Sequence, residues 1–376
     1  MRALEQLFAR SADDGQPFLA LPDAHNPRIL VPPGKRAFVR QSLRLHNTAA
    51  PINRMGKALI SAVWPLPRLF LQANYFPTSQ FAELLHQIAT LLQIPQERLQ
   101  AAVYIGSPGL SRKITLQLMN RAGEILGYVK IGDTDSNRPF VQNEANTCLE
   151  LAHIQWHSIL IPSILFLQKY GDWILLGEGD SASEGRSVGY DLSDEITTAL
   201  IELASKTCMQ SHTGEFYNSI RRQLESFVKE TELLQIGLSA LDRIKAGGSM
   251  PIRIHGDFVP YNLKRTDRGV AVVDWEFSQS MGLPLYDLFH FIIQGHRQIF
   301  SWPLEKIIEK KIIGHAGNRQ AICRYCDRLG IKKMNIRDFL IGYFLTFSIF
   351  STEHLGVAEA DARSLQRIID RFSRAF

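Results

Sequence analysis

The sequence predicts an α+β protein in which a small five-stranded sheet lobe is followed by a larger helical lobe. The first reason is a series of five short strand-like runs between residues 101 and 176, interrupted by one helical pattern. The second is the helical periodicity that dominates after Asp191. The third is a composition of 45% hydrophobic and 21% charged residues in 376, which is ordinary for a globular chain with a substantial core.

Five segments of the predicted lobe have strand character. The expected strands are Val103–Ile105, Ile114–Met119, Glu124–Ile131, Leu160–Leu167 and Trp173–Leu176. Asn120–Gly123 has the composition of a hairpin turn between the second and third strands. A helix is expected over 140–153, because apolar residues recur there at helical spacing.

The first 95 residues have a different pattern from the rest of the chain. Residues 17–33 read as two short strands around a turn, and 80–92 as an amphipathic helix. The apolar stretch 59–76 contains Pro65 and Pro67, which exclude one long helix. We therefore expect three parts: an N-terminal extension (1–95) packed on the core, a nucleotide-binding sheet lobe (96–176) and a helical lobe (177–376).

The net charge of +5 is unevenly distributed. No acidic residue occurs from Ala24 to Ala82, whereas Arg28 to Arg68 contains eight Lys and Arg residues. We expect this basic 28–68 stretch to form a solvated surface or to pack on the acidic middle of the chain. The alternative is that it contacts a membrane surface or a partner protein. We expect no nucleic-acid partner.

The remaining composition favours a cytoplasmic protein. Four cysteines are too few for a disulfide scaffold and suit a reducing compartment. The longest apolar run, Phe339–Phe350, has twelve residues, whereas a bilayer-spanning helix needs roughly 20. We expect a buried helix there.

The segment from Ile254 to Glu276 contains the residues with the clearest chemistry. Asp257 and Asn262 lie five residues apart in a predicted loop, and a hairpin then leads to Asp274 and Glu276. Phosphoryl transfer needs a carboxylate that orients the attacking hydroxyl and accepts its proton, and oxygen ligands that hold Mg²⁺ against nucleotide phosphates. Asp257 suits the first task, and Asn262 and Asp274 suit the second.

This segment resembles the aminoglycoside phosphotransferase and choline kinase family. The resemblance rests on His255-Gly-Asp-Phe-Val-Pro-Tyr-Asn262 and Asp274-Trp-Glu276, with Gly282-Leu-Pro284 and Tyr286-Asp287-Leu288 further on. The family is related to the protein kinases but acts on small molecules, and its fold is the two-lobed protein-kinase fold. The catalytic loop of the protein kinases has the same D-x-x-x-x-N spacing. The resemblance covers roughly residues 100–300 and is weak in the first 95.

The resemblance implies roles for residues of the sheet lobe. Lys130, near the end of the third strand, occupies the place of the lysine that binds the α- and β-phosphates of ATP. Glu144 on the following helix is its expected ion partner, in preference to Glu150. Gly106, Ser107 and Gly109 form the loop expected to cover the nucleotide.

Four further residues acquire roles from the same resemblance. Glu178 lies where the two lobes join and adenine meets the chain. His255 and Asp287 are expected to brace the catalytic loop, and Glu276 to serve as an extra Mg²⁺ ligand or water holder.

The sequence thus predicts an ATP- and Mg²⁺-dependent phosphotransferase acting on a hydroxyl of a small metabolite: a sugar, an amino alcohol or an aminoglycoside-like compound. Two alternatives stay open. One is a pseudokinase-like binding or regulatory protein. The other is a kinase that acts on a protein or on a membrane-associated glycan precursor.

Overall fold

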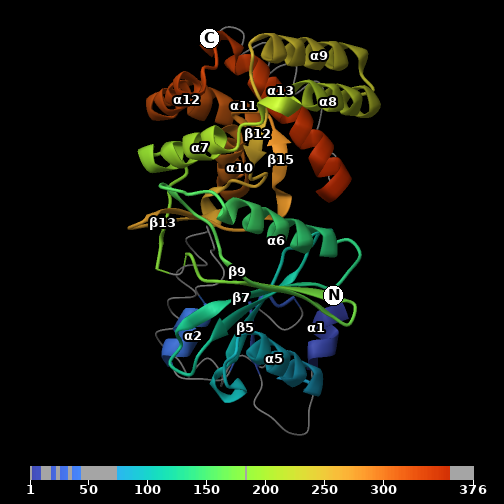
Figure 1. The fold of residues 1–376 in the computed structure, drawn as a ribbon, viewed down its shortest axis with the longest axis vertical. Helices are drawn as coiled ribbons and strands as arrows, with labels where there is room; N and C mark the ends of the chain where they lie inside the picture. The colour runs from blue at the N-terminus through green and yellow to red at the C-terminus, as the bar shows by residue number, and fades with distance from the viewer. Residues whose placement is uncertain are drawn as a thin grey trace. The chain divides into compact units, whose positions relative to one another are not determined.

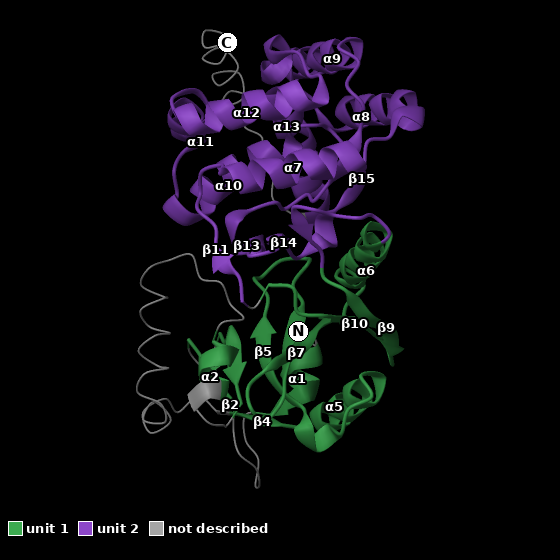
Figure 2. Cartoon of the chain, turned by 60° about the vertical axis from the view of Figure 1, so that its left-hand side comes forward, with its two compact units in different colours: residues 1–152, 162–183 green, residues 153–161, 184–376 purple. Residues whose placement is uncertain are grey.

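The computed structural model describes residues 2–9, 18–22, 26–32, 36–43, 74–182 and 184–355. Within it the chain forms two compact units, residues 1–152 with 162–183 and residues 153–161 with 184–376, which Figure 2 colours separately. Most of the basic 28–68 stretch and of the apolar 59–76 stretch lies outside the described residues.

The first unit is built on a sheet of nine strands among the described residues, in the order β1-β4-β2-β3-β5-β6-β7-β10-β9. Its strands are β1 (Phe8–Ala9), β2 (Phe18–Leu21), β3 (Ile29–Val31), β4 (Asn74–Pro77), β5 (Gln100–Ile105), β6 (Ile114–Met119), β7 (Ile125–Gly132), β9 (Ile164–Tyr170) and β10 (Trp173–Glu178). Its helices are α1 (Arg2–Leu7), α2 (Arg36–Ser42), α5 (Ser79–Leu91) and α6 (Arg138–Ala152). All pairings in this sheet are antiparallel.

The predicted number of five strands in this sheet is wrong. The five expected strands are present as β5, β6, β7, β9 and β10, but β1 to β4 from the first 95 residues extend the same sheet through the pairing of β3 with β5. The fourth expected strand also begins later, at Ile164, because Pro162 interrupts the run; Ile159–Leu160 forms the separate β8 of the second unit. The domain boundary at residue 95 stays a prediction.

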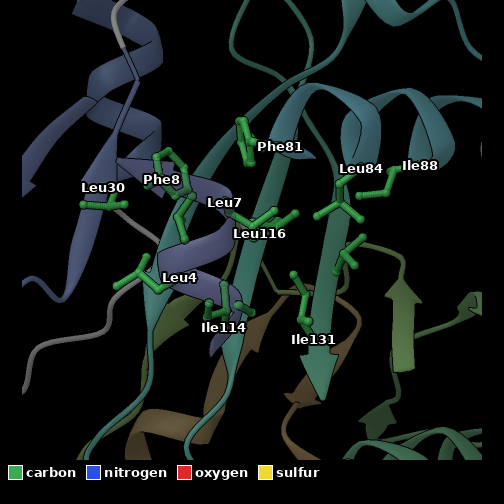
Figure 3. Packing of buried hydrophobic residues seen from close by; sticks show 14 of the residues in the cluster. Leu4, Leu7, Phe8, Leu30, Phe81, Leu84, Ile88, Ile114, Leu116 and Ile131 are labelled. Carbon is green, nitrogen blue, oxygen red and sulfur yellow. The ribbon is translucent and has the colours of Figure 1, made fainter. Parts of the chain in front are cut away.

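One face of the sheet is covered by α1 and α5 (Figure 3). Leu4 and Leu7 of α1 and Leu84 of α5 are buried against Ile114 and Leu116 of β6. Along β6 and β7 apolar residues alternate with polar ones, so successive side chains point to opposite faces of the sheet. The face toward α1 and α5 therefore receives the apolar side chains, and the opposite face receives the polar ones. Helix α6 lies on that opposite face, where its residues pack with Leu176 of β10.

The second unit is mainly helical (Figure 1). Its helices are α7 (Asp194–Lys206), α8 (Thr213–Phe227), α9 (Thr231–Ala246), α10 (Tyr286–Phe300), α11 (Leu304–Ile307), α12 (Ala316–Leu329) and α13 (Ile336–Phe350). Its short strands are β8 (Ile159–Leu160), β11 (Arg186–Ser187), β12 (Ile252–Ile254), β13 (Leu263–Thr266), β14 (Gly269–Val272) and β15 (Gln279–Gly282). Helix α13 contains the apolar run and is buried against α9, α8 and α10, as predicted. Among the described residues no helix is long and apolar enough to cross a membrane.

Glu202 of α7 secures the segment that leads into β8. Its carboxylate accepts the backbone N–H groups of His157 (2.8 Å) and Ser158 (2.7 Å) and lies 2.7 Å from Lys206 Nζ. Burial alone would raise the pKa of Glu202, but the hydrogen bonds from Lys206, Ser158 and His157 together lower it to about 2.

A depressed folded-state pKa predicts how stability depends on pH. The contribution of Glu202 is fully present above its ordinary value of 4.5 and is lost as pH falls through about 2. We expect Glu202→Gln to lower the free energy of unfolding at pH 7 by on the order of 2–3 kcal/mol, and this difference to shrink below pH 4.5. Urea unfolding at pH 7 and pH 3.5 measures it. Glu195→Gln, on the exposed start of the same helix, is the control; an equal loss in both variants would contradict the assignment.

Candidate active site

The loop from His255 to Asn262 follows β12 directly and ends in the 3₁₀ turn Pro260–Asn262. Gly256 has a φ of 85°, in the left-handed region, and the carbonyl oxygen of Phe277 occupies the place where a Cβ would lie. Only glycine combines this backbone conformation with such a close approach. Gly256 therefore permits the sharp turn that immediately precedes Asp257.

Asp287 anchors the start of this loop. It lies in the first turn of α10, and its two carboxylate oxygens accept the backbone N–H groups of His255 (2.6 Å) and Gly256 (3.1 Å). Burial raises the pKa of Asp287, while His255 and the two N–H donors oppose that rise. The bracing contacts expected of Asp287 are therefore present.

His255 connects the loop to the strand that carries Asp274. Its Nδ1 accepts the backbone N–H of Asp257 (3.2 Å), so Nε2 carries the ring proton and donates to the carbonyl of Val273 (3.1 Å). Burial lowers the pKa of His255, which favours this neutral form. The ring also packs on Trp275, with centroids 4.6 Å apart.

The Asp257 carboxylate is held at both oxygens. Asn262 Nδ2 donates to Asp257 Oδ2 and to its backbone carbonyl, both at 3.0 Å. His290 Nε2 lies 3.1 Å from Asp257 Oδ1. The side chain is 23% exposed, so the carboxylate keeps an open side. Each carboxylate oxygen has two acceptor positions, and the fixed group can still accept a proton.

The loop and the segment that follows the β13–β14 hairpin contain oxygen donors of the kind that magnesium prefers. Because Nδ2 of Asn262 is directed at Asp257, the amide oxygen is the part of Asn262 left for a cation. Asp274 has a left-handed backbone (φ 71°) and follows Val273, whose N–H donates to the carbonyl of Asn262 (3.0 Å). Glu276, in the 3₁₀ turn Trp275–Phe277, is 8% exposed. One amide and one or two carboxylates suffice for Mg²⁺ when phosphates and water complete the shell.

A second group of charged residues lies on the polar face of the first unit's sheet. Lys130 of β7 forms ion pairs with Glu144 of α6 and with Glu178 of β10, the latter at 3.1 Å. The Glu144 side chain is fully buried, and those of Lys130 and Glu178 are 9% and 4% exposed. The expected Lys130–Glu144 pair is thus present, whereas Glu150 is exposed on α6.

Lys113 also belongs to this group, and it was not among the residues predicted from the sequence. Its Nζ lies 3.8 Å from Glu144 Oε2, and its side chain is 9% exposed. The signal was available in the alternation of β6, where apolar Ile114 and Leu116 face the core and the residues between them face α6. Thr115 pairs with Lys130 across the strands, which places Lys113 on the same face.

The predicted glycine loop connects β5 to β6, and the N-terminal segment contacts it. Gly106 N–H donates to the carbonyl of Lys113 (2.9 Å), which closes the base of the loop. Arg28, beside β3, donates from Nη2 to Ser107 Oγ (2.9 Å). Gly109 lies at the turn with a φ of 153°. Whether this loop covers a nucleotide stays a prediction.

We expect Lys130→Met to destabilise the first unit and to weaken nucleotide binding. Removing Lys130 leaves Glu144 and Glu178 buried without their common cation, and breaking a buried ion pair in this way costs about 3–5 kcal/mol. Loss of a charge-assisted contact to phosphate should weaken Mg-ATP binding about tenfold or more. Urea unfolding and calorimetry measure the two effects. Lys169→Met, at an exposed position of β9, is the control, and an equal effect there would contradict both roles.

His290 also was not among the site residues predicted from the sequence. It lies one helical turn after Asp287 on α10, so the two side chains share a face of the helix. That spacing was the available signal: a helix whose Asp287 braces the loop also directs residue 290 toward it.

A family model described as the phosphotransferase enzyme family matches residues 96–318, more than half of the chain. The choline kinase LicA from Streptococcus pneumoniae is 13% identical, with a TM-score of 0.48, over 79% of this chain and 100% of that one. A thermostable aminoglycoside phosphotransferase APH(4)-Ia, solved with ADP and hygromycin B, is also 13% identical, with a TM-score of 0.45, over 78% and 98%. A putative fructosamine-3-kinase from Thermobifida fusca is 16% identical, with a TM-score of 0.38, over 76% and 99%. No curated protein matches the sequence.

Proposed function

The chain belongs to the phosphotransferase enzyme family, and from this premise we propose that it transfers the γ-phosphate of ATP, with Mg²⁺, to a hydroxyl of a small metabolite. The observation that carries the proposal is the Asp257 carboxylate, held at both oxygens near the braced start of the loop and left open on one side. A fixed carboxylate of this kind suits the orientation of an attacking hydroxyl.

In the proposed reaction Asp257 orients the acceptor hydroxyl and accepts its proton as the hydroxyl oxygen bonds to the γ-phosphorus. The bond between that phosphorus and the bridging oxygen of ADP breaks, and ADP leaves with the electron pair. Asn262 and Asp274 would hold Mg²⁺, with Glu276 as a further ligand or water holder. Bound Mg²⁺ supplies positive charge that offsets the charge of the phosphates. Lys130 would contact the phosphates, held in place by Glu144 and Glu178.

The proposed acceptor is a sugar, an amino alcohol or an aminoglycoside-like compound. Fold alone does not set the substrate of a kinase-like protein, so this proposal rests on the family resemblance of the catalytic loop. The retention of Lys130, Asp257, Asn262 and Asp274 favours an enzyme over a pseudokinase-like binding protein.

A panel of hydroxyl compounds tests the proposal. The purified full chain is incubated with Mg-ATP and each of a set of sugars, amino alcohols and aminoglycosides, and ADP release is measured. We expect at least one class to raise ADP release above the rate with water, and chelation of Mg²⁺ to abolish it. Mg-ATP binding without turnover for every compound would favour the binding-protein alternative.

A further inference from the structure

The site contains a buried histidine to which none of the roles above has been assigned. His290 of α10 is 2% exposed, and its Nε2 lies 3.1 Å from Asp257 Oδ1. Asp257 and His290 are 33 residues apart in the sequence, so their contact depends on the packing of α10 against the catalytic loop. A buried ring nitrogen in contact with the reacting carboxylate can determine where that carboxylate points.

A short chain of hydrogen bonds fixes which nitrogen of His290 carries the proton. Gln294 Nε2 donates to the hydroxyl oxygen of Tyr343 (3.4 Å), and the Tyr343 hydroxyl lies 3.3 Å from His290 Nδ1. The carboxylate oxygen Oδ1 of Asp257 can only accept, so His290 Nε2 carries a ring proton and donates it there. With the proton on Nε2, Nδ1 is the acceptor for the single proton of the Tyr343 hydroxyl.

Aromatic packing holds the ring of His290 in this orientation. Tyr286 stacks on it, with centroids 5.9 Å apart and an interplanar angle of 12°. Phe347 and Tyr343 of α13 contact it edge-on, at 5.3 Å and 6.0 Å. Neighbours on two helices leave the imidazole little freedom to rotate, so its Nε2–H is a fixed donor.

We propose that His290 is a positioning residue for Asp257, and that Gln294 and Tyr343 set its tautomer. His290 holds Oδ1 while Asn262 holds Oδ2, which fixes the plane of the carboxylate and directs its remaining lone pairs at the acceptor hydroxyl. This inference rests on the proposed function. It adds a role for α10 and α13, which form no part of the catalytic loop or the hairpin.

The kinetic test compares two substitutions at the same position, with Mg-ATP as substrate and water as acceptor. We expect His290→Leu to lower kcat for ADP release by about 10- to 100-fold with KM for Mg-ATP unchanged, since small misplacements of a catalytic group can cost about 10². His290→Gln should recover kcat to within a few-fold of wild type, because its side-chain amide can donate from a similar position. Tyr343→Phe should lower kcat less than His290→Leu does, since it removes the tautomer restraint and keeps the donor.

Two matched controls separate positioning from structure. His296 is also buried on α10, but its Nδ1 contacts the carbonyl of Ile292 in its own helix. We expect His296→Leu and His296→Gln to leave kcat within about two-fold of wild type. If His290 had only a structural role, His290→Leu and His290→Gln would instead lower kcat by similar amounts, in proportion to their loss of thermal stability. Full activity of folded His290→Leu would overturn the inference.

A spectroscopic arm does not depend on turnover. In protein labelled with ¹⁵N-histidine, Nε2 of His290 should carry a proton, and Asp257→Ala should make that proton exchange faster. An Nε2 without a proton, or no response to Asp257→Ala, would overturn the inference. If the tautomer is as expected but wild type releases no ADP under any condition, the proposed function fails while the hydrogen bond stands.

Discussion

Asp257→Ala should lower kcat by roughly 10²–10⁴-fold and leave the protein folded. A positioned general base typically contributes an acceleration of that size. Asp257 lies in a loop with its side chain 23% exposed, so its removal leaves no cavity in the core. Asp257→Asn should lose a similar factor, because an amide can orient a hydroxyl but cannot accept its proton. The measurement is kcat for ADP release with the best acceptor, alongside thermal unfolding.

Asp267→Asn provides a matched control for this prediction. Asp267 is exposed at the tip of the β13–β14 hairpin, ten residues from Asp257, and should change neither kcat nor stability appreciably. If folded Asp257→Ala kept more than about a tenth of wild-type activity, Asp257 would not be the group that orients the acceptor.

Asp274→Ala should weaken Mg-dependent ATP binding by roughly 100-fold or more. A metal ion at the phosphates is worth several kcal/mol, and each 1.4 kcal/mol is a factor of ten in affinity. Asn262→Ala should weaken binding less, because a neutral amide attracts Mg²⁺ less strongly than a carboxylate does. Asn262→Ala should also lower kcat, since it frees Asp257 Oδ2. Calorimetric titration of Mg-ATP, with and without chelator, measures the binding.

The pattern across these variants identifies the ligands. Asp274→Ala and wild type should bind ATP with similar affinity in chelator, where no metal is held. Equal, tight Mg-ATP binding by wild type, Asp274→Ala and Asn262→Ala would show that neither residue holds the ion.

The fold class and the strands β5, β6, β7, β9 and β10 were predictable because their signals are local. Alternation along β6 and the turn at Asn120–Gly123 specify a hairpin within 20 residues. The two short strands expected in 17–33 are present and form the β2–β3 hairpin. That β1 to β4 extend the sheet was not predictable in this way, because β4 pairs with β1 and β2, and β3 with β5, across distant segments. Short strands carry too few positions to show a period, and their register is set by tertiary packing.

The site residues also differ in how far the sequence alone could predict them. Asp257, Asn262 and Asp274 lie on one loop and the hairpin that follows it, so a sequence pattern can place them together. A strand face brings Lys113 to Glu144 in the first unit, and helix packing brings His290 to Asp257 in the second. The alternation of β6 and the three-residue spacing from Asp287 pointed to these two residues, but only the packing of each element shows which partner its side chain meets.

The most direct test of the central claim is a ³¹P NMR time course of the full chain with Mg-ATP and the best acceptor from the panel, with Asp257→Ala run in parallel. We predict that the γ-phosphate resonance of ATP declines while ADP and a new phosphomonoester resonance grow at equal rates in wild type. Asp257→Ala should show almost none of this change. ATP that stays intact with every acceptor class, or a phosphomonoester that forms equally fast with Asp257→Ala, would contradict the account.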